Sequence, residues 1–250
     1  MQTFWTKMHP SKPLVNLVWW DCLVLSVIFF GEAIWISTQE WLAQGGGQAE
    51  PYEFTANDNW QALLGQGWLL ILALLYLWIR HYDFRQLQAK LEWSLLWKPI
   101  VIFVGAALVC DVSFALAALI PGVQVDVNPW LYLPYLSFSP MTLLDNLTRV
   151  DFSTVAYSLF NGFYEEFFFL GLLLSTPIKS RRLVLLWSTF IRIAFHTYQG
   201  LVPALVIGVS FGLFYYWVYT RKTQNLLQFS LAHAFADMVG INLFLLFLPI

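Results

Sequence analysis

The sequence is poor in charge, and this excludes an ordinary water-soluble domain. Only 11% of its 250 residues are Asp, Glu, Lys or Arg, whereas soluble domains carry about 25%. Hydrophobic residues make up 59% of the chain. The formal net charge is −2, and no basic patch marks a nucleic-acid surface. The composition predicts a membrane protein whose surroundings are the lipid bilayer, with no nucleic-acid partner.

Cysteine is nearly absent as well. Cys22 and Cys110 both fall in apolar runs and form no CxxC motif, which excludes a disulfide framework. We expect both to be packing thiols. The chain also lacks internal repeats and a recognisable soluble domain.

Apolar runs, by contrast, are plentiful and have the length of about 20 residues that a bilayer requires. The sequence therefore predicts an all-α, polytopic transmembrane helix bundle. We expect about seven spans, at 15–37, 60–79, 97–120, 152–175, 183–199, 201–219 and 226–248.

The few cations indicate how this bundle is oriented. Cytosolic loops of membrane proteins carry an excess of Lys and Arg. With a cytosolic N-terminus, all of the 13 Lys and Arg except Arg149 and Arg192 fall on the cytosolic side, and the acidic segment 38–59 falls outside. The proline- and aromatic-rich segment 121–150 is expected to lie along the membrane surface. We predict a multi-pass protein of the cell (plasma or inner) membrane.

Ionisable side chains within the spans are few, and most occur in the last hundred residues. Such groups at bilayer depth cost ~2.5–3.5 kcal/mol each on insertion scales and mark functional sites by default. Positions four apart share one helix face, and a rise of 1.5 Å per residue brings the groups to a similar depth. This predicts a shared hydrated cavity. The groups form three sets on three spans: Glu165 with Glu166, Arg192 with His196, and His233 with Asp237.

With these residues in view, the sequence resembles the CPBP family, the CAAX proteases and bacteriocin-processing enzymes, which are glutamate-type intramembrane endopeptidases. The family pattern is Glu-Glu, three residues and Arg, then His in the next helix, then His-x-x-x-Asn or Asp in a later helix. The matching stretches are "EEFFFLG" (165–171), "RIAFHTYQG" (192–200) and "HAFAD" (233–237). The resemblance covers about the last 110 residues.

Because the family resemblance covers only the last part of the chain, we divide the single membrane domain into two parts. Residues 1–140 hold spans and loops without diagnostic motifs, and residues 141–250 are interpreted as the catalytic helical core. One position departs from the family pattern, because Leu170 stands where the family has Arg. Glu166 thereby lacks its partner four residues along the helix. Arg192 is a candidate substitute, and a protonated Glu166 or an impaired site are the alternatives.

The resemblance implies hydrolysis of a peptide bond by an activated water, without a cofactor. Glu165 would be the general base, and His196 would help to hold the water. His233 would donate to the oxyanion, with Asp237 orienting its ring. Glu166 would tune Glu165 or hold Arg192. The substrate would be a peptide or a membrane protein, and nothing in the sequence marks a prenyl pocket.

Other functions fit the same residues. Glu165, His196 and His233 could bind zinc in a metal-dependent version of the protease, although HExxH is absent. A degenerate, non-catalytic family member could act as a scaffold or as a bacteriocin-immunity protein. A transporter with a proton relay would be expected to show an inverted repeat, which is not seen. Asp21, Glu32 and Asp111 lack motif context and are expected to serve structural pairing or to line a cavity.

Overall fold

The computed structural model describes residues 9–45, 55–125 and 127–249. These residues fold into helices, and no β-strand occurs among them. Lys7 and residues 46–54 of the acidic outer segment lie outside the described residues. The helices are α2 (Trp19–Ala43), α3 (Ala56–Ile79), α4 (Lys98–Ala117), α5 (Pro129–Tyr132), α6 (Pro140–Thr148), α7 (Phe152–Glu166), α8 (Arg181–His196), α9 (Leu201–Leu205), α10 (Gly212–Arg221) and α11 (Leu226–Val239).

Four helical runs in the described residues are long and apolar enough to cross a membrane. They are α2, α3, α4 and the continuous run from α9 to α10, Leu201–Arg221. Each coincides with a predicted span. The predicted span 152–175 is one continuous helical run that begins with α7, and α8 is a shorter helix of 16 residues. The all-helical fold with several membrane-spanning helices is confirmed, whereas the number seven and the orientation stay predictions.

The last predicted span, 226–248, is wrong as a single helix. Helix α11 ends at Val239, and Gly240 follows with φ of +85°, a left-handed conformation that glycine adopts without strain. Beyond it, Asp111 of α4 accepts hydrogen bonds from the Asn242 side chain and the Leu243 N–H, each at 3.1 Å. The chain therefore turns back toward α4 and does not continue the helix.

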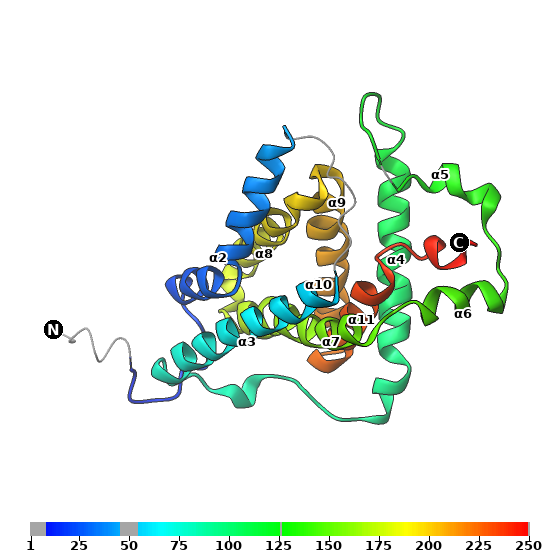
Figure 1. The fold of residues 1–250 in the computed structure, drawn as a ribbon. Helices are drawn as coiled ribbons and strands as arrows, with labels where there is room; N and C mark the ends of the chain where they lie inside the picture. Colours follow the sequence, from blue (N-terminus) through cyan, green and yellow to red (C-terminus); the bar gives the residue numbers. More distant parts are fainter. Residues whose placement is uncertain (1–8, 46–54, 126, 250) are drawn as a thin grey trace.

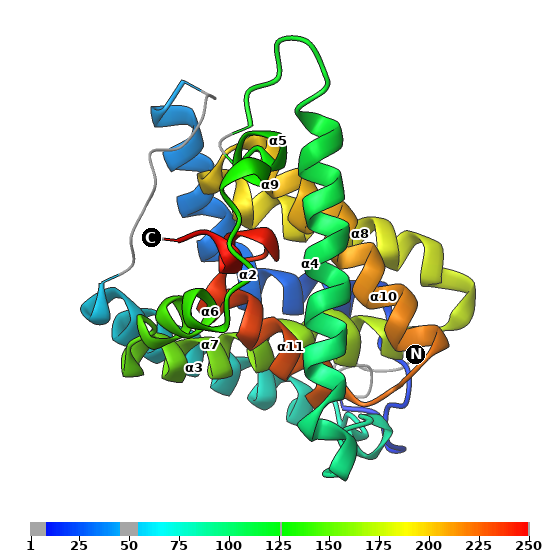
Figure 2. The same ribbon diagram turned by 90° about the vertical axis from the view of Figure 1, so that its right-hand side faces the viewer.

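Helices α3, α7 and α11 lie side by side, and α7 is the middle one (Figures 1 and 2). The crossing of α7 and α11 depends on Gly162. A Cβ atom at this position would collide with the Ser230 carbonyl oxygen and lie 2.8 Å from the Ala234 nitrogen. The two backbones approach closely only because glycine has no side chain. This close approach sets Glu165 and Glu166 against the helix that carries His233.

Local hydrogen bonds fix where the site helices begin. The Asp151 carboxylate accepts hydrogen bonds from Ser153 and from the Thr154 N–H at the start of α7, and these bonds lower its pKa. Asn225 precedes α11, accepts from the Leu227 N–H and donates to Glu92 at 2.8 Å. This donation lowers the pKa of Glu92. The loop before α4 is thereby attached to the start of α11.

Helix α4 stands beside the bundle, with α5, α6 and the C-terminal segment next to it (Figure 1). The predicted interfacial segment 121–150 contains α5 and α6. The Asn146 side chain of α6 donates to the carbonyls of Leu246 and Leu248 at 2.9 and 3.1 Å. These contacts attach the segment to the C-terminus, while its position along a membrane surface stays a prediction.

Candidate active site

The centre of the candidate site is an ion pair between α7 and α8. Arg192 Nη2 donates to both oxygens of Glu166, at 2.8 and 3.0 Å. Its Nη1 lies 3.6 Å from Glu165 Oε2. All three side chains are buried, Glu166 completely. Leu170 leaves Glu166 without the arginine partner of the family pattern. Arg192 of the neighbouring helix α8 supplies that partner.

Two π-helical segments hold the Arg192 guanidinium. Phe167–Leu172 follows the Glu pair directly, and Val206–Phe211 joins α9 to α10. The guanidinium carbon lies 3.8 Å from the ring centroid of Phe169 and 5.8 Å from that of Phe211. One aromatic ring from each segment therefore faces the cation, which is a favourable arrangement in a desolvated site. Such π segments are frequent at functional sites.

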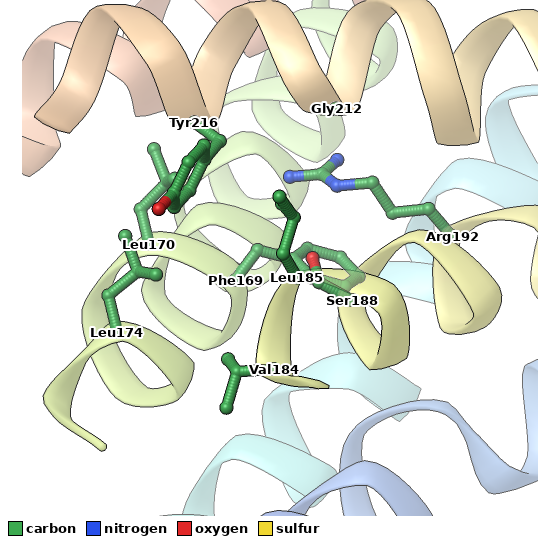
Figure 3. A pocket seen from close by; sticks show the side chains of 9 residues that line it. All are labelled: Phe169, Leu170, Leu174, Val184, Leu185, Ser188, Arg192, Gly212 and Tyr216. Carbon is green, nitrogen blue, oxygen red and sulfur yellow. The ribbon is translucent and has the colours of Figure 1, made fainter. Parts of the chain in front are cut away.

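Leu170 and Arg192 line the same small pocket (Figure 3). The pocket lies between the first π segment, α8 and α10, and its other walls are largely apolar. Gly212, the second glycine of the GVSFG motif, also lines it, and a Cβ there would lie 3.2 Å from Arg192 Cδ. Gly208 and Gly212, which have the spacing of a GxxxG helix-packing motif, therefore both face α8. The leucine that replaces the family arginine and the arginine that pairs with Glu166 are thus neighbours in space.

His233 of α11 faces carboxylates on both sides of its ring. Nδ1 lies 2.7 Å from Glu166 Oε1. Nε2 lies 3.5 Å from Asp237 Oδ1 and 3.8 Å from Glu165 Oε2. Carboxylate oxygens accept hydrogen bonds, so both nitrogens can donate only when the ring carries two protons. The shortest contact that orients the ring comes from Glu166, whereas the sequence pattern suggested Asp237 for this task.

Glu165 is anchored through one oxygen only. Its Oε1 accepts a hydrogen bond of 3.2 Å from Asn161 Nδ2. Its Oε2 is buried and accepts no hydrogen bond from the described residues, although Arg192 and His233 lie 3.6 and 3.8 Å away. A carboxylate oxygen that keeps its lone pairs while cations stand nearby can take a proton from a water molecule.

His196 stands apart from this cluster. Its Nδ1 lies 2.7 Å from the Arg192 carbonyl oxygen one turn earlier on α8. A carbonyl only accepts, so Nδ1 carries the proton and Nε2 is the acceptor in the neutral ring. In the described residues, no hydrogen bond or ion pair joins the His196 side chain to the carboxylates. The structure therefore brings together five of the six predicted residues, and the sixth, His196, contacts the backbone of Arg192.

Two amides that sequence reasoning missed belong to the cluster. Asn161 Nδ2 donates to Asp237 Oδ2 at 2.8 Å as well as to Glu165. Asn161 Oδ1 accepts from Gln66 Nε2 of α3 at 2.7 Å. The spacing of four between Asn161 and Glu165 was the available signal. The sequence offered no comparable signal for Gln66, because the helix that carries it contains no motif.

Of the three acidic residues without motif context, two have structural partners. Asp21 is fully buried, lies 2.7 Å from the Arg80 guanidinium and accepts from the Tyr76 hydroxyl at 2.6 Å. Asp111 holds the turn after α11, as described above. Glu32 is exposed on α2.

The zinc alternative is not supported by a ready-made ligand set. In the described parts of the chain, no group of three or more His, Cys, Asp or Glu is placed to hold a metal ion. Glu165 and His233 lie in one cluster, but no contact joins His196, the third predicted ligand, to either of them among the described residues. Metal dependence is therefore a question for experiment.

Comparisons with known proteins agree with the motif pattern. Residues 150–239 match the family model described as type II CAAX prenyl endopeptidase Rce1-like. The match contains the Glu pair, Arg192 and both histidines, and it ends before the turn at Gly240. No curated protein and no solved structure matches the chain.

Proposed function

We propose that this chain, whose residues 150–239 match the type II CAAX prenyl endopeptidase Rce1-like family model, is an intramembrane endopeptidase that hydrolyses a peptide bond with a Glu165-activated water. The observation that supports this most is the buried contact of Glu165, Glu166, Arg192 and His233, which three helices form together. Its substrate is a peptide or a membrane protein that reaches the site from the cytosolic side.

The geometry supports a division of tasks. Glu165 Oε2 takes the proton from water, since this oxygen accepts no hydrogen bond from the described residues. His233 stands beside it and donates toward the oxyanion or the leaving nitrogen. Glu166 orients His233 through Nδ1, and Arg192 compensates the charge of Glu166. His196 offers Nε2 as a further acceptor for the water.

A degenerate, non-catalytic protein is the less favoured alternative. Its main support was the missing arginine at Leu170, and the contact between Arg192 and Glu166 supplies the cation from another helix. A scaffold would not need the intact Glu pair and would tolerate a neutral residue at position 165.

The test compares membrane and secreted peptides from cells that carry the wild-type protein or Glu165→Gln. General-base catalysis contributes roughly 10²–10⁴-fold, so we expect the product peptides to fall at least ~100-fold while membrane expression is unchanged. Glu40→Gln, at an exposed position of α2, is the matched control. Equal products from wild-type and Glu165→Gln cells would refute the proposal. A chelator arm, with zinc added back, tests the metal-dependent alternative.

A further inference from the structure

Helix α3 is joined to α7 by two polar contacts on one face. Asn59 Nδ2 donates to the hydroxyls of Ser153 and Thr154, at 3.0 and 3.1 Å. Seven residues later, Gln66 Nε2 donates to Asn161 at 2.7 Å. A separation of seven is two helical turns, so both amides face α7. Most of the remaining α3 surface is apolar and exposed, so these amides determine how α3 sits on α7.

The contact at Gln66 continues directly to two carboxylates. Asn161 Nδ2 donates to both Glu165 Oε1 and Asp237 Oδ2. Carboxylates accept hydrogen bonds, so the NH₂ end of Asn161 must face them and its carbonyl end must face Gln66. Gln66 in turn satisfies that carbonyl with its own NH₂ group. Each amide thus has one chemically permitted orientation, and the donation from Gln66 stabilises that of Asn161 by satisfying its carbonyl oxygen.

We propose that Gln66 is a positioning residue of the active site, which acts through Asn161 to hold Glu165 and Asp237 in place. This rests on the function proposed above, with Glu165 as the base. Two carboxylates that share one amide donor can both remain ionised close together, because a hydrogen bond to the charged form favours that form. The site then includes α3, which lies outside the 150–239 family match.

The first test needs no proteolysis. A hydrophobic carbodiimide reacts with protonated carboxyl groups in apolar surroundings, and mass spectrometry reports the labelled fraction of Glu165 at each pH. The ionisable groups around Glu165 are Glu166, Tyr157 and Tyr164 on α7, Arg192 on α8, Tyr198 after it, and His233 and Asp237 on α11. Gln66→Met removes the donor without adding charge or substituting any of these groups.

In Gln66→Met we expect the midpoint of Glu165 labelling to rise by about 0.5–1 pH unit. Gln61→Met is the matched control, since Gln61 is exposed on the same helix, and it should leave the midpoint unchanged. Gln66→Ala is the second variant, in case Met disturbs the packing of the detergent-solubilised protein. Midpoints equal to that of the wild type in both Gln66 variants would overturn the inference.

The second test separates this inference from the proposed function. With a peptide that contains the cleavage site found in the Glu165→Gln comparison, we expect Gln66→Met to lower kcat roughly tenfold at unchanged KM. In an Asn161→Leu background the same change should cost less than about twofold, since the two residues act in one chain. A wild-type protein without peptidase activity would refute the function but leave the labelling result valid. Full activity in Gln66→Met would refute only the inference.

Discussion

Arg192 compensates the charge of both adjacent glutamates of the site. It contacts both oxygens of Glu166 and lies 3.6 Å from Glu165, with almost no exposed surface. Removing one partner of a buried ion pair costs about 3–5 kcal/mol, because the other charge remains buried without compensation. Arg192 therefore allows the adjacent carboxylates to be buried together.

We accordingly expect Arg192→Leu to abolish cleavage and to lower the free energy of unfolding by about 3–5 kcal/mol. Adding Leu170→Arg returns a cation beside the same pocket, four residues after Glu166, and should restore part of both losses. Thermal unfolding in detergent and peptide cleavage measure the two effects. Arg182→Leu, at an exposed position of α8, is the control. If the double variant is no better than Arg192→Leu, the two positions do not substitute for one another.

Among the individual site residues, the charged ones could be predicted from the sequence and the neutral ones could not. The carboxylates, Arg192 and His233 could be identified because each is costly in an apolar span and follows a spaced motif. Asn161 and Gln66 could not, since a neutral amide in a helix has no such cost signal and its partner lies about 95 residues away in the sequence. The spacing from Arg192 predicted a shared helix face for His196, but only coordinates show that its Nδ1 is bound to that residue's carbonyl.

Among the helices, the crossing of α7 and α11 is the most constrained contact. We expect Gly162→Ala to lower the free energy of unfolding by about 1–3 kcal/mol, because the new Cβ forces the two backbones apart. Activity should fall as well, since His233 moves with α11. Thermal unfolding of the purified protein measures the first effect. Gly65→Ala on α3, where a Cβ meets nothing within 4 Å, is the control, and an equal melting temperature in both variants would contradict the close-contact explanation.

The ends of the helices could be predicted best where the length of the apolar run alone determines them. The predicted spans 60–79 and 97–120 begin and end within a few residues of α3 and α4. The predicted end of α11 was wrong because the chain after Gly240 is held by a contact with α4, which is distant in the sequence. The segment after Gly240 is apolar, so hydropathy continues it, yet Asp111 binds the turn at Asn242 and Leu243. Hydropathy also cannot detect the π segments beside Arg192.

For the whole molecule, the segment that the family model matches does not form the candidate site by itself. Helices α7, α8 and α11 supply the charged groups, but the amide that orients Asn161 comes from α3. Helix α2 also contacts α8 and the turn that follows it, where Ser37 bonds to the hydroxyl of Thr197 and the N–H of Tyr198. The division into 1–140 and 141–250 therefore describes where motifs occur, and both parts contribute contacts that hold the site.

The orientation in the membrane that the cations predict can be tested directly. Lys179 lies just before α8, and Arg181 and Arg182 form its first two residues. Ser180→Cys should therefore be cytosolic, whereas Thr148→Cys at the end of α6 should face outside. The native Cys22 and Cys110 are buried, which keeps background labelling low. With a membrane-impermeant maleimide, we expect intact cells to label Thr148→Cys only, and permeabilised cells to label both. The reverse pattern would place the N-terminus outside and would require the substrate to approach the Glu165 site from the opposite face.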